Sequence, residues 1–564
     1  MNALLKFVLS LAMACTPAFA AEADSIFVGG TIVTINDIQP NAQAVAIADG
    51  KIIAVGERKK ITKLHRGKNT KIVDLAGKTL VPGFIDPHSH FMNALAVVNQ
   101  VNVSAPPVGP ASRVSDIVTA LQRFAVAKKI APGELIIGYG YDENLLPADE
   151  PLTRDSLDPA FPDNPVLIMH VSLHGAVLNG AAMQKYGISA ATKTPPGGII
   201  LRKAGTDEPS GLVMETAYLP IYSRLPAPTA EGEFEQLRLA QELYAAAGIT
   251  TAHEGATHGA QFDLLKRAAN AEKLFLDVVA YPFITDLDAV LRSNPAESFG
   301  KYNKHLKLGG CKIVLDGSVQ GRTGFFTTPY LRGGPGGEAD WYGSPSFMPE
   351  IFDRMIKKCY DLGLQVQVHA NGDAAIDLAI KGHESAAADD LNKDRRTTII
   401  HAQFVRKDQL EKFVRYRLIP SFFTQHAFFF SEAHLLNRGK AQTYGLSPMR
   451  SAMAMGLRPT NHTDFNVTPI NQMFTLWTAV TRQSRTGEVI GPDERVSALD
   501  ALKAITLNAA YQYGEEGRKG SIEVGKLADF VVLDANPLTV APNAIKDIKV
   551  LQTIKEGRVV FPAK

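Results

Sequence analysis

Residues 80–91 read Leu-Val-Pro-Gly-Phe-Ile-Asp-Pro-His-Ser-His-Phe. The apolar run, broken by a Pro-Gly pair, predicts a short buried strand that ends in His88 and His90. Residues i and i+2 of an extended strand point to the same side, so the two imidazoles can converge on one ion. Two histidines alone are as compatible with simple hydrogen bonding as with a metal site. The interpretation depends on further ligands along the chain.

The composition is that of an ordinary globular protein. The chain has 564 residues, of which 45% are hydrophobic and 21% charged, enough for two or more packed domains. Its 59 basic and 57 acidic side chains give a net charge of +2, without the basic excess that nucleic acid or an anionic membrane surface attracts. We expect a small-molecule partner and no nucleic acid.

The first twenty residues resemble a bacterial secretory signal. Lys6 precedes the apolar run 7–14, and small residues at 18 and 20 predict cleavage after Ala20. A lipoprotein signal at Cys15 is the alternative, which Met13 disfavours. No other run approaches the ~20 apolar residues of a membrane helix. The sequence predicts a periplasmic or secreted protein with no membrane association after cleavage.

Two cysteines remain after this cleavage, Cys311 and Cys359. Both lie in or beside apolar segments, which favours buried, unreactive side chains. Two cysteines are too few for a disulfide framework, so we expect both to stay as thiols.

The two ends of the chain share a β-rich pattern. Residues 21–78 hold short β-prone runs separated by glycine-containing turns, of which Asp49-Gly50 predicts a hairpin. Residues 501–564 repeat this pattern, with Gly525 and Gly557 at turns. We predict that the two segments pair into one small β-sandwich domain and are not two unrelated β pieces.

The middle of the chain, residues 79–500, alternates between strands and helices. Strand-like runs such as 312–315 and 397–400 are interleaved with helical patterns such as 348–362. This order predicts an α/β domain of parallel βα units, closed as a barrel or open as a doubly wound sheet. We expect residues from about 100 to 235 to form an insert that caps the mouth of this domain.

Four further polar residues stand inside or at the ends of predicted strands: Lys312, His369, His401 and Asp464. His401 follows His369 by 32 residues, about one βα unit, and Asp464 follows His401 by 63 residues, about two units. The carboxyl ends of barrel strands meet at one mouth. A set of metal ligands at that mouth, joined by the first histidine pair, fits these spacings.

Together the motifs resemble the amidohydrolase superfamily, in its branch of long metal-dependent hydrolases that includes N-substituted formamide deformylase and YtcJ-like proteins. The resemblance covers nearly the whole mature chain. It rests on residues 81–90, 312–318, 369–373, 401–403, 464 and 520–530, in this order. It implies a (β/α)₈ TIM-type barrel with a split β-sandwich, and hydrolysis of amide-like bonds at a divalent metal site.

The resemblance also implies which residues hold the metal. His88 and His90, together with Asp464, match the ligands of the more buried ion. His369 and His401 match the ligands of a second ion. Two Zn²⁺ per chain are therefore expected.

Lys312 and Asp464 have further implied roles. Lys312 matches a lysine that carries CO₂ as a carbamate and bridges both ions in related binuclear enzymes; the alternative is a salt-bridged structural lysine. The two ions would activate a water as hydroxide and polarise the scissile carbonyl. Asp464 would be the catalytic residue that takes the proton and passes it to the leaving nitrogen.

Substrate recognition is harder to predict. Asp142 and His174 lie in the predicted cap, and Arg322 follows the strand of the predicted lysine, where it can hold a substrate carboxylate. We take these three as substrate-binding candidates. Two segments depart from the family: residues 461–465 replace the usual Gly-Ser-Asp-x-Pro pattern, and residues 253–254 read His-Glu where His-Asp is common.

Two other functional classes stay open at this point. One is a mononuclear deaminase or cyclic-amide hydrolase, which the number of ions per chain would separate from a binuclear enzyme. The other is a catalytically weak regulatory or binding protein, which the intact ligand set disfavours. The sequence specifies neither the substrate nor the oligomeric state, and a homodimer is compatible with it.

Overall fold

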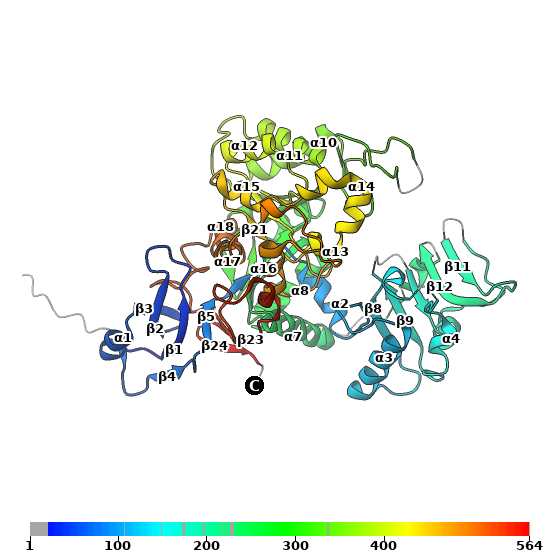
Figure 1. The fold of residues 1–564 in the computed structure, drawn as a ribbon, viewed down its shortest axis with the longest axis horizontal. Coiled ribbons are helices and arrows are strands. Elements are labelled where there is room, and N and C mark those ends of the chain that lie inside the picture. The colour runs from blue at the N-terminus through cyan, green and yellow to red at the C-terminus, as the bar shows by residue number, and fades with distance from the viewer. Residues whose placement is uncertain are drawn as a thin grey trace, which may run out of the picture.

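The computed structural model describes residues 21–562, except 107, 148, 172–174, 196–197, 216, 223, 226–229 and 335–337. Along its longest axis, a sheet near the N-terminus is followed by a central α/β domain and then by the insert (Figure 1). The predicted signal, residues 1–20, lies outside the described residues, and so does His174.

The central domain contains strands that follow one another both in sequence and in space. They form two five-stranded sheets, in the orders β15-β16-β14-β13-β6 and β17-β18-β19-β20-β21. The strands are β6 (Phe84–Ile85), β13 (Ile249–Thr257), β14 (Asp277–Pro282), β15 (Tyr302–Asn303), β16 (Leu306–Leu308), β17 (Gly310–Val314), β18 (Gln365–Ala370), β19 (Thr398–His401), β20 (Ile419–Phe422) and β21 (Thr460–Asn461). All of their pairings are parallel except that of β15 with β16.

The two sheets meet at one interrupted strand. Only Gly309 separates β16 from β17, and a parallel bridge joins Phe283 to Lys312 just beyond the break. A Cβ at position 309 would lie 2.3 Å from the ring of Tyr281, so glycine is required for this close approach. Among the described strands no ladder pairs β21 with β6. The α/β class is confirmed, but a closed barrel is not seen.

Helices connect the strands and cover them. Pro349 begins α10, and Phe352, Ile356 and Cys359 repeat at helical spacing to bury one face of it. The helices here are α2 (Phe91–Val97), α7 (Ala230–Ala246), α8 (Gly259–Asn270), α9 (Leu287–Ser293), α10 (Pro349–Asp361), α11 (Asp373–Ala386), α12 (Lys407–Tyr416), α13 (His426–Phe429), α14 (Ser431–Tyr444), α15 (Met449–Ala454), α16 (Gln472–Thr481), α17 (Ala498–Ala504) and α18 (Leu507–Gln512). No helix in the described part of the chain is long and apolar enough to cross a membrane.

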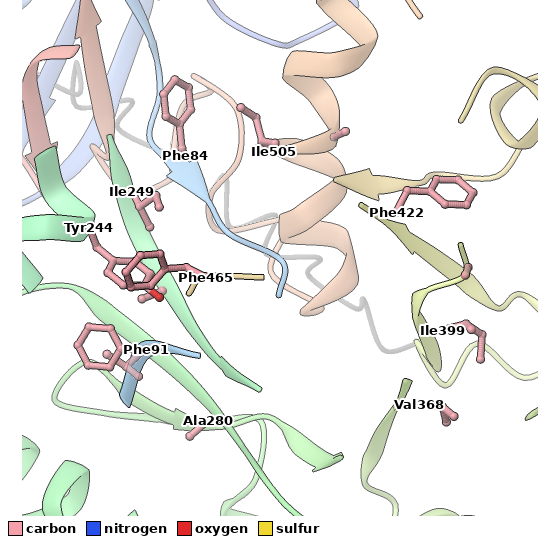
Figure 2. Close-up of a cluster of buried hydrophobic side chains, with 14 of the residues drawn as sticks. Phe84, Phe91, Tyr244, Ile249, Ala280, Val368, Ile399, Phe422, Phe465 and Ile505 are labelled. Carbon is pink, nitrogen blue, oxygen red and sulfur yellow. The ribbon is translucent and has the colours of Figure 1, made fainter. Parts of the chain in front are cut away.

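The main apolar core joins these strands to their helices. Phe84 and Ile249 contribute from β6 and β13, and Val368, Ile399 and Phe422 contribute from β18, β19 and β20 (Figure 2). All five side chains are buried. Such close packing fixes the strands relative to one another, and therefore also the residues at their carboxyl ends.

Cys311 and Cys359 form a disulfide, so the prediction of two thiols is wrong. Their Cα atoms lie 6.6 Å apart, within the span of a disulfide. The buried face of α10 places Cys359 against β17, which carries Cys311. The cysteine count argued only against a framework of several disulfides. It could not show that two residues 48 apart in sequence meet in space.

Strands from both chain ends form one mixed eight-stranded sheet. Its order is β24-β23-β22-β5-β1-β2-β3, with β4 beside β1. The strands are β1 (Ser25–Val33), β2 (Asn41–Ala48), β3 (Lys51–Gly56), β4 (Lys71–Asp74), β5 (Thr79–Pro82), β22 (Phe530–Leu533), β23 (Val550–Lys555) and β24 (Arg558–Phe561), and α1 (Arg58–His65) follows β3. The antiparallel pairing of β22 with β5 brings the two ends together.

The insert has a sheet of its own, which the sequence patterns did not separate from the central domain. Its order is β11-β12-β10-β9-β8-β7. The elements are β7 (Val101–Asn102), α3 (Val114–Lys128), β8 (Ile136–Tyr141), α4 (Arg154–Leu157), β9 (Val166–His170), β10 (Gly175–Leu178), α5 (Gly180–Tyr186), β11 (Gly198–Arg202), β12 (Pro209–Glu215) and α6 (Leu219–Tyr222). The predicted insert is therefore a folded unit with its own apolar clusters.

Candidate metal centre

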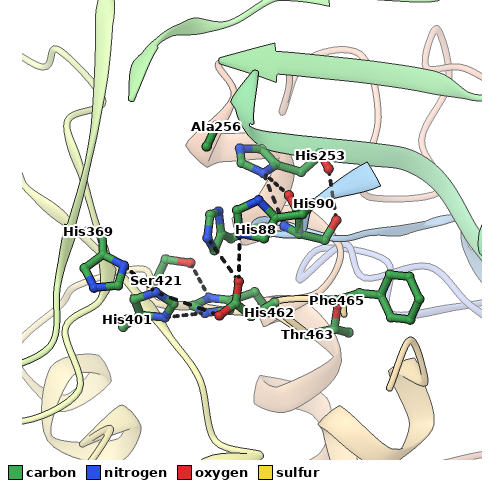
Figure 3. Close-up of polar contacts among 12 residues, drawn as sticks. His88, His90, His253, Ala256, His369, His401, Ser421, His462, Thr463 and Phe465 are labelled. Atoms are coloured by element: carbon green, nitrogen blue, oxygen red, sulfur yellow. Dashed lines mark hydrogen bonds and ion pairs between the residues drawn. The ribbon is translucent and has the colours of Figure 1, made fainter. Parts of the chain in front are cut away.

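Three predicted ligands converge where the first and last central strands end. His88 and His90 follow β6, and Asp464 follows β21. The Nε2 atoms of His88 and His90 each lie 3.3 Å from Oδ1 of Asp464. Figure 3 shows the two imidazoles side by side above the chain that carries residues 462–465. The three side chains form a group that can hold a metal ion.

The second predicted pair lies beside this group. His369 belongs to β18, and His401 ends β19. Nε2 of His401 is 3.0 Å from Nδ1 of His369 and 4.0 Å from Oδ2 of Asp464. Two imidazole nitrogens that face each other so closely can share one proton or bind one cation. The structure thus brings three of the four predicted histidine ligands within 4.0 Å of one carboxylate and places the fourth, His369, against His401.

Lys312 is buried without a hydrogen-bond partner. It lies in β17, opposite Gln367 of β18, and is 1% exposed. Its Nζ makes no hydrogen bond to any described residue. Burial lowers the pKa of Lys312 to about 7, although the charges of Asp464 and Glu254 act in the opposite direction. A large fraction of this amine is therefore neutral at neutral pH.

Burial and mutual contacts set the charge of the other ligands. Burial lowers the pKa of His88 and of His401 well below the usual value, so both rings are neutral. Burial would raise the pKa of Asp464, but the neighbouring imidazoles of His88 and His90 hold it well below its usual range. Neutral imidazole and ionised carboxylate are the forms that bind metals.

Asp316, which the sequence did not single out, orients His369. Its carboxylate accepts hydrogen bonds from the backbone nitrogens of Phe325, Asn371 and Gly372, at 2.8–2.9 Å. Its Oδ1 also lies 3.4 Å from Nε2 of His369. A carboxylate behind a ligating histidine fixes the ring orientation and its tautomer. Asp316 lies in the motif 312–318, so its position was visible in the sequence although its role was not.

A hydrogen-bonded chain supports His401 from the other side. Its Nδ1 is 3.0 Å from Nε2 of His462, and Nδ1 of His462 is 3.0 Å from Oγ of Ser421 (Figure 3). Burial lowers the pKa of His462 to about 3, so this ring is neutral. His462 lies in the segment that departs from the family pattern. The departure was visible in the sequence, but its contact with His401 was not.

Two further features hold the strand ends in place. Oγ1 of Thr463 donates a hydrogen bond to Oδ2 of Asp86 at 2.5 Å, and both residues are buried. Gly255 leaves room for a ligand, since a Cβ there would lie 2.5 Å from Cε1 of His88. The strand that carries Gly255 therefore sets the position of the His88 ring.

Of the three substrate-binding candidates, the structure describes Asp142 and Arg322. Asp142 groups with Glu143 and His170 in the insert. Arg322 lies half-buried in the loop after β17, where its carbonyl accepts a hydrogen bond from Nε1 of Trp341 at 2.6 Å. No contact seen among the described residues joins Asp142 or Arg322 to the metal ligands, so their role stays a prediction. The third candidate, His174, lies outside the described residues.

The chain is similar over most of its length to known proteins. Residues 71–561 match the model of the amidohydrolase family. The chain is 26% identical over 543 residues to N-substituted formamide deformylase of Arthrobacter pascens, across 95% of this chain and 97% of the deformylase. It is 26% identical over 551 residues to the protein YtcJ of Bacillus subtilis (strain 168), across 95% of this chain and 99% of YtcJ.

A solved structure agrees with these relatives. An uncharacterized metal-dependent hydrolase from Pyrococcus horikoshii OT3 superposes with a TM-score of 0.70 at 25% identity, across 92% of this chain and 99% of that chain. The resemblance inferred from the motifs is thereby confirmed. The chain belongs to the amidohydrolase family, and it is a hydrolase that acts on carbon–nitrogen bonds other than peptide bonds.

Proposed function

We propose that this protein is an exported, metal-dependent amidohydrolase that cleaves the C–N bond of a small amide, formamide or N-acyl compound. The convergence of His88, His90 and Asp464 carries the proposal, together with the amine of Lys312, which has no hydrogen-bond partner among the described residues. The likeness to a formamide deformylase supports the substrate class. The small-molecule partner expected from the charge balance is the substrate itself.

The proposal includes a closed (β/α)₈ barrel. Backbone hydrogen bonds support it: the nitrogen of Asp464 donates to the carbonyl of His88 at 3.0 Å, and the nitrogen of His90 donates to the carbonyl of Phe465 at 2.8 Å. They connect the segment after β21 to the segment after β6, which are the two open edges. The fold of the family supports the same closure.

The proposal also includes a β-sandwich built from the chain ends. Neighbouring residues of β1 bury into different apolar clusters, Phe27 into one and Ile26 and Val28 into another. Because successive side chains of a strand point to opposite faces, both faces of the terminal sheet are covered. A sheet covered on both faces suits a two-layered domain.

The residues fit two divalent ions, for which we propose Zn²⁺. His88, His90 and Asp464 would hold one ion, and His369 and His401 the other. Nζ of Lys312 and Oδ1 of Asp464 are buried and lack hydrogen-bond partners among the described residues. A buried polar atom without a partner costs free energy. A cation, or a group bound to one, would remove that cost.

Lys312 would contribute as a carbamate. Its pKa of about 7 leaves neutral amine that can attack CO₂. The nitrogen lone pair forms an N–C bond, one proton leaves to solvent, and a singly charged carbamate results. Its oxygens are hard ligands of the kind that bridge two ions, which an ammonium group cannot provide. The carbamate would also replace a costly buried cation with an anion beside two ions.

The chain's own residues would move the proton. Divalent ions, when bound, lower the pKa of a water and polarise a carbonyl. Asp464 is ionised, because His88 and His90 hold its pKa far below neutrality, so it can accept a proton from the attacking water. The same carboxyl group can then donate that proton to the leaving nitrogen. We expect Asp464→Asn to abolish turnover.

Export rests on residues 1–20 and gains support from the disulfide. Disulfides persist mainly in oxidising compartments such as the periplasm or the extracellular space. The disulfide between Cys311 and Cys359 suits such a location. We propose that the protein works there without membrane association or nucleic acid, either as a monomer or as a homodimer.

Metal analysis beside an activity panel tests the function. We would measure ions per chain in the wild type and in Lys312→Ala, with and without bicarbonate, and assay N-acyl and formamide substrates. The proposal predicts that the metal-centre ions fall from two to one or fewer in the variant, together with activity. One metal-centre ion in both proteins would make Lys312 structural and favour a mononuclear deaminase or cyclic-amide hydrolase. A full ion content without turnover on any substrate would favour a regulatory or binding protein.

A further inference from the structure

Three polar side chains form a buried cluster beside the metal centre but separate from it. We call Gln403, His426 and His434 the glutamine–histidine cluster. Gln403 follows β19 by two residues, His426 begins α13, and His434 lies in α14. Their exposed fractions are 0%, 4% and 0%. None of them is among the predicted ligands, and the proposed reaction does not use them.

One atom of each side chain points to the same spot. Nε2 of Gln403 lies 2.6 Å from Nδ1 of His426 and 3.1 Å from Nε2 of His434. Nδ1 of His426 and Nε2 of His434 are 3.0 Å apart. The three atoms therefore all contact one another. No hydrogen bond to a described residue satisfies Oε1 of Gln403 or Nδ1 of His434.

Hydrogen bonds cannot satisfy such a triangle. Each nitrogen of a neutral imidazole is either a donor or an acceptor, an amide nitrogen is a donor, and an amide oxygen is an acceptor. Each of the three atoms is either a donor or an acceptor, so at least two of them have the same role. One of the three contacts therefore always places two donors or two acceptors face to face at 3.1 Å or less. Rotating the amide of Gln403 by 180° or protonating a histidine changes which two atoms form the unfavourable contact, but one such contact always remains.

A cation removes the conflict, because all three atoms can then be acceptors directed at one positive charge. The two ends of an amide are assigned from their surroundings, so Oε1 of Gln403 can take the place of Nε2. This exchange leaves the number of unsatisfied amide atoms unchanged. The free energy gained when a cation binds therefore comes from removing the contact between two donors or two acceptors. Zn²⁺ binds imidazole nitrogen at about 2.0–2.1 Å and carboxylate oxygen at about 2.0–2.2 Å.

The surroundings suit an ion with neutral imidazole ligands. The rings of Phe423 and Phe430 lie 4.4 and 4.8 Å from the ring of His426, and that of Phe404 lies 5.6 Å from His434. Burial lowers the pKa of His434 to about 3, which keeps its ring neutral. The rings of His426 and His434 are nearly parallel, with an interplanar angle of 4° and centroids 5.2 Å apart.

We propose that Gln403, His426 and His434 bind a divalent transition-metal ion of the Zn²⁺, Ni²⁺ or Cu²⁺ class, as a site distinct from the catalytic centre. Imidazole nitrogen is the preferred ligand of these metals. The three protein ligands leave one position for water. The ion would tie α13 and α14 to the end of β19, the strand that carries His401.

The test counts ions in variants that keep the size and apolar surroundings of the cluster. We would compare the purified wild type with His434→Phe and with Gln403→Met. The matched control is His383→Phe, because His383 is also buried but contacts the hydroxyl of Tyr360 and the carbonyl of Leu391 through its two nitrogens. Ion content falls by one per chain in each cluster variant and stays at the wild-type value in the control.

A second protein separates this site from the catalytic centre. His88→Ala/His90→Ala/Asp464→Ala removes the ligands of one catalytic ion and leaves His369 and His401. With added Co²⁺ or Cu²⁺ it should still show an absorption band from the glutamine–histidine cluster, a band that disappears when His434→Phe is added. This result would stand even if the proposed reaction were wrong. The inference is overturned if folded His434→Phe binds as many ions as the wild type, or if the triple variant gives no such band.

Discussion

Gly255 controls the position of a metal ligand without touching a metal itself. A Cβ at this position would lie 2.5 Å from Cε1 and 2.8 Å from Nδ1 of His88, closer than side-chain atoms approach. Gly255 and His88 are both buried in the packed interior, so neither can move freely. The site thus depends on the absence of a side chain as much as on the ligands themselves.

Gly255→Ala should therefore displace the His88 ring and weaken metal binding by about tenfold or more, since small changes around metal ligands have effects of this size. Competition with a chelator would measure the affinity. Gly517→Ala is the control, because a Cβ there meets no atom within 4 Å. Unchanged affinity in Gly255→Ala would mean that the His88 ring does not need its present position.

His462 should matter through His401. If Nδ1 of His401 donates to Nε2 of His462, the other nitrogen of His401 keeps its lone pair for a metal. His462→Phe removes this acceptor and should weaken binding of the second ion by about 10–100-fold. His462→Gln, which retains an acceptor, should recover part of the affinity in the same metal titration. Equal affinities in all three proteins would assign His462 to packing alone.

The sequence singled out the residues proposed as metal ligands, but not the residues that contact them from behind. His88 and His90 obey the two-residue period of a strand, and His369 and His401 lie at or next to the ends of strands of their own, so local patterns identify them. His462 supports a residue 61 positions earlier, and Asp316 supports one 53 positions later. Such contacts depend on how the strands are arranged in space, which no local pattern contains.

Strand β17 and helix α10 are joined both by packing and by a disulfide. Cys311 precedes Lys312, so the cross-link lies next to a predicted metal ligand. A cross-link between residues 48 apart removes conformational freedom from the unfolded chain. The element that carries Lys312 is thereby held against the helix that follows it.

Cys311→Ala/Cys359→Ala should lower the free energy of unfolding by about 2–4 kcal/mol, the usual contribution of a native disulfide. Denaturant unfolding of the metal-free protein would measure it and keep the metal contribution out of the comparison. Reductant should destabilise the wild type and leave the variant unchanged. If reductant leaves the free energy of unfolding of the wild type unchanged, Cys311 and Cys359 are not joined.

Element types were predictable, whereas their assignment to sheets was only partly so. The pattern at 348–362 became α10, and that at 397–400 became β19. Residues 136–170 also contain strands, but these pair within the insert. Short apolar strands look alike in sequence wherever they pair, so the insert was predicted as a cap and not as a separate sheet.

At the scale of the whole molecule, a buried charge network joins the central domain to the terminal sheet. Asp277 of β14 contacts Nζ of Lys555 in β23 at 3.1 Å, and Lys555 contacts Asp529, next to β22, at 3.1 Å. Lys519 adds a second cation beside Asp277. All four side chains are nearly inaccessible to solvent. Here the terminal sheet and the central domain are held together by charged side chains as well as by apolar contacts.

Lys555→Met should lower the free energy of unfolding by about 3–5 kcal/mol, because it leaves buried carboxylates with too few cations. Lys546→Met is the control, since Lys546 pairs with Asp547 at the surface, where such pairs contribute about 0–1 kcal/mol. Chemical denaturation of both variants would measure how much free energy of unfolding each substitution removes. Similar small losses would show that the network contributes no more than a surface pair.

The network also predicts how stability changes in acid. Burial would raise the pKa of Asp277, but Lys519 and Lys555 hold it well below its usual range. A carboxyl whose pKa is lower in the folded state stabilises the fold above its unfolded pKa, about 3.9 for Asp, and loses this contribution as the pH falls further. In Lys555→Met one of the two lysines beside Asp277 is lost, so the pKa of Asp277 is lowered less than in the wild type. The free energy of unfolding of this variant should therefore fall less steeply as the pH decreases. The difference from the wild type should therefore narrow below about pH 4. A difference that stays constant from pH 7 to pH 3 would mean that Lys555 stabilises the junction by packing, independently of the charge on Asp277.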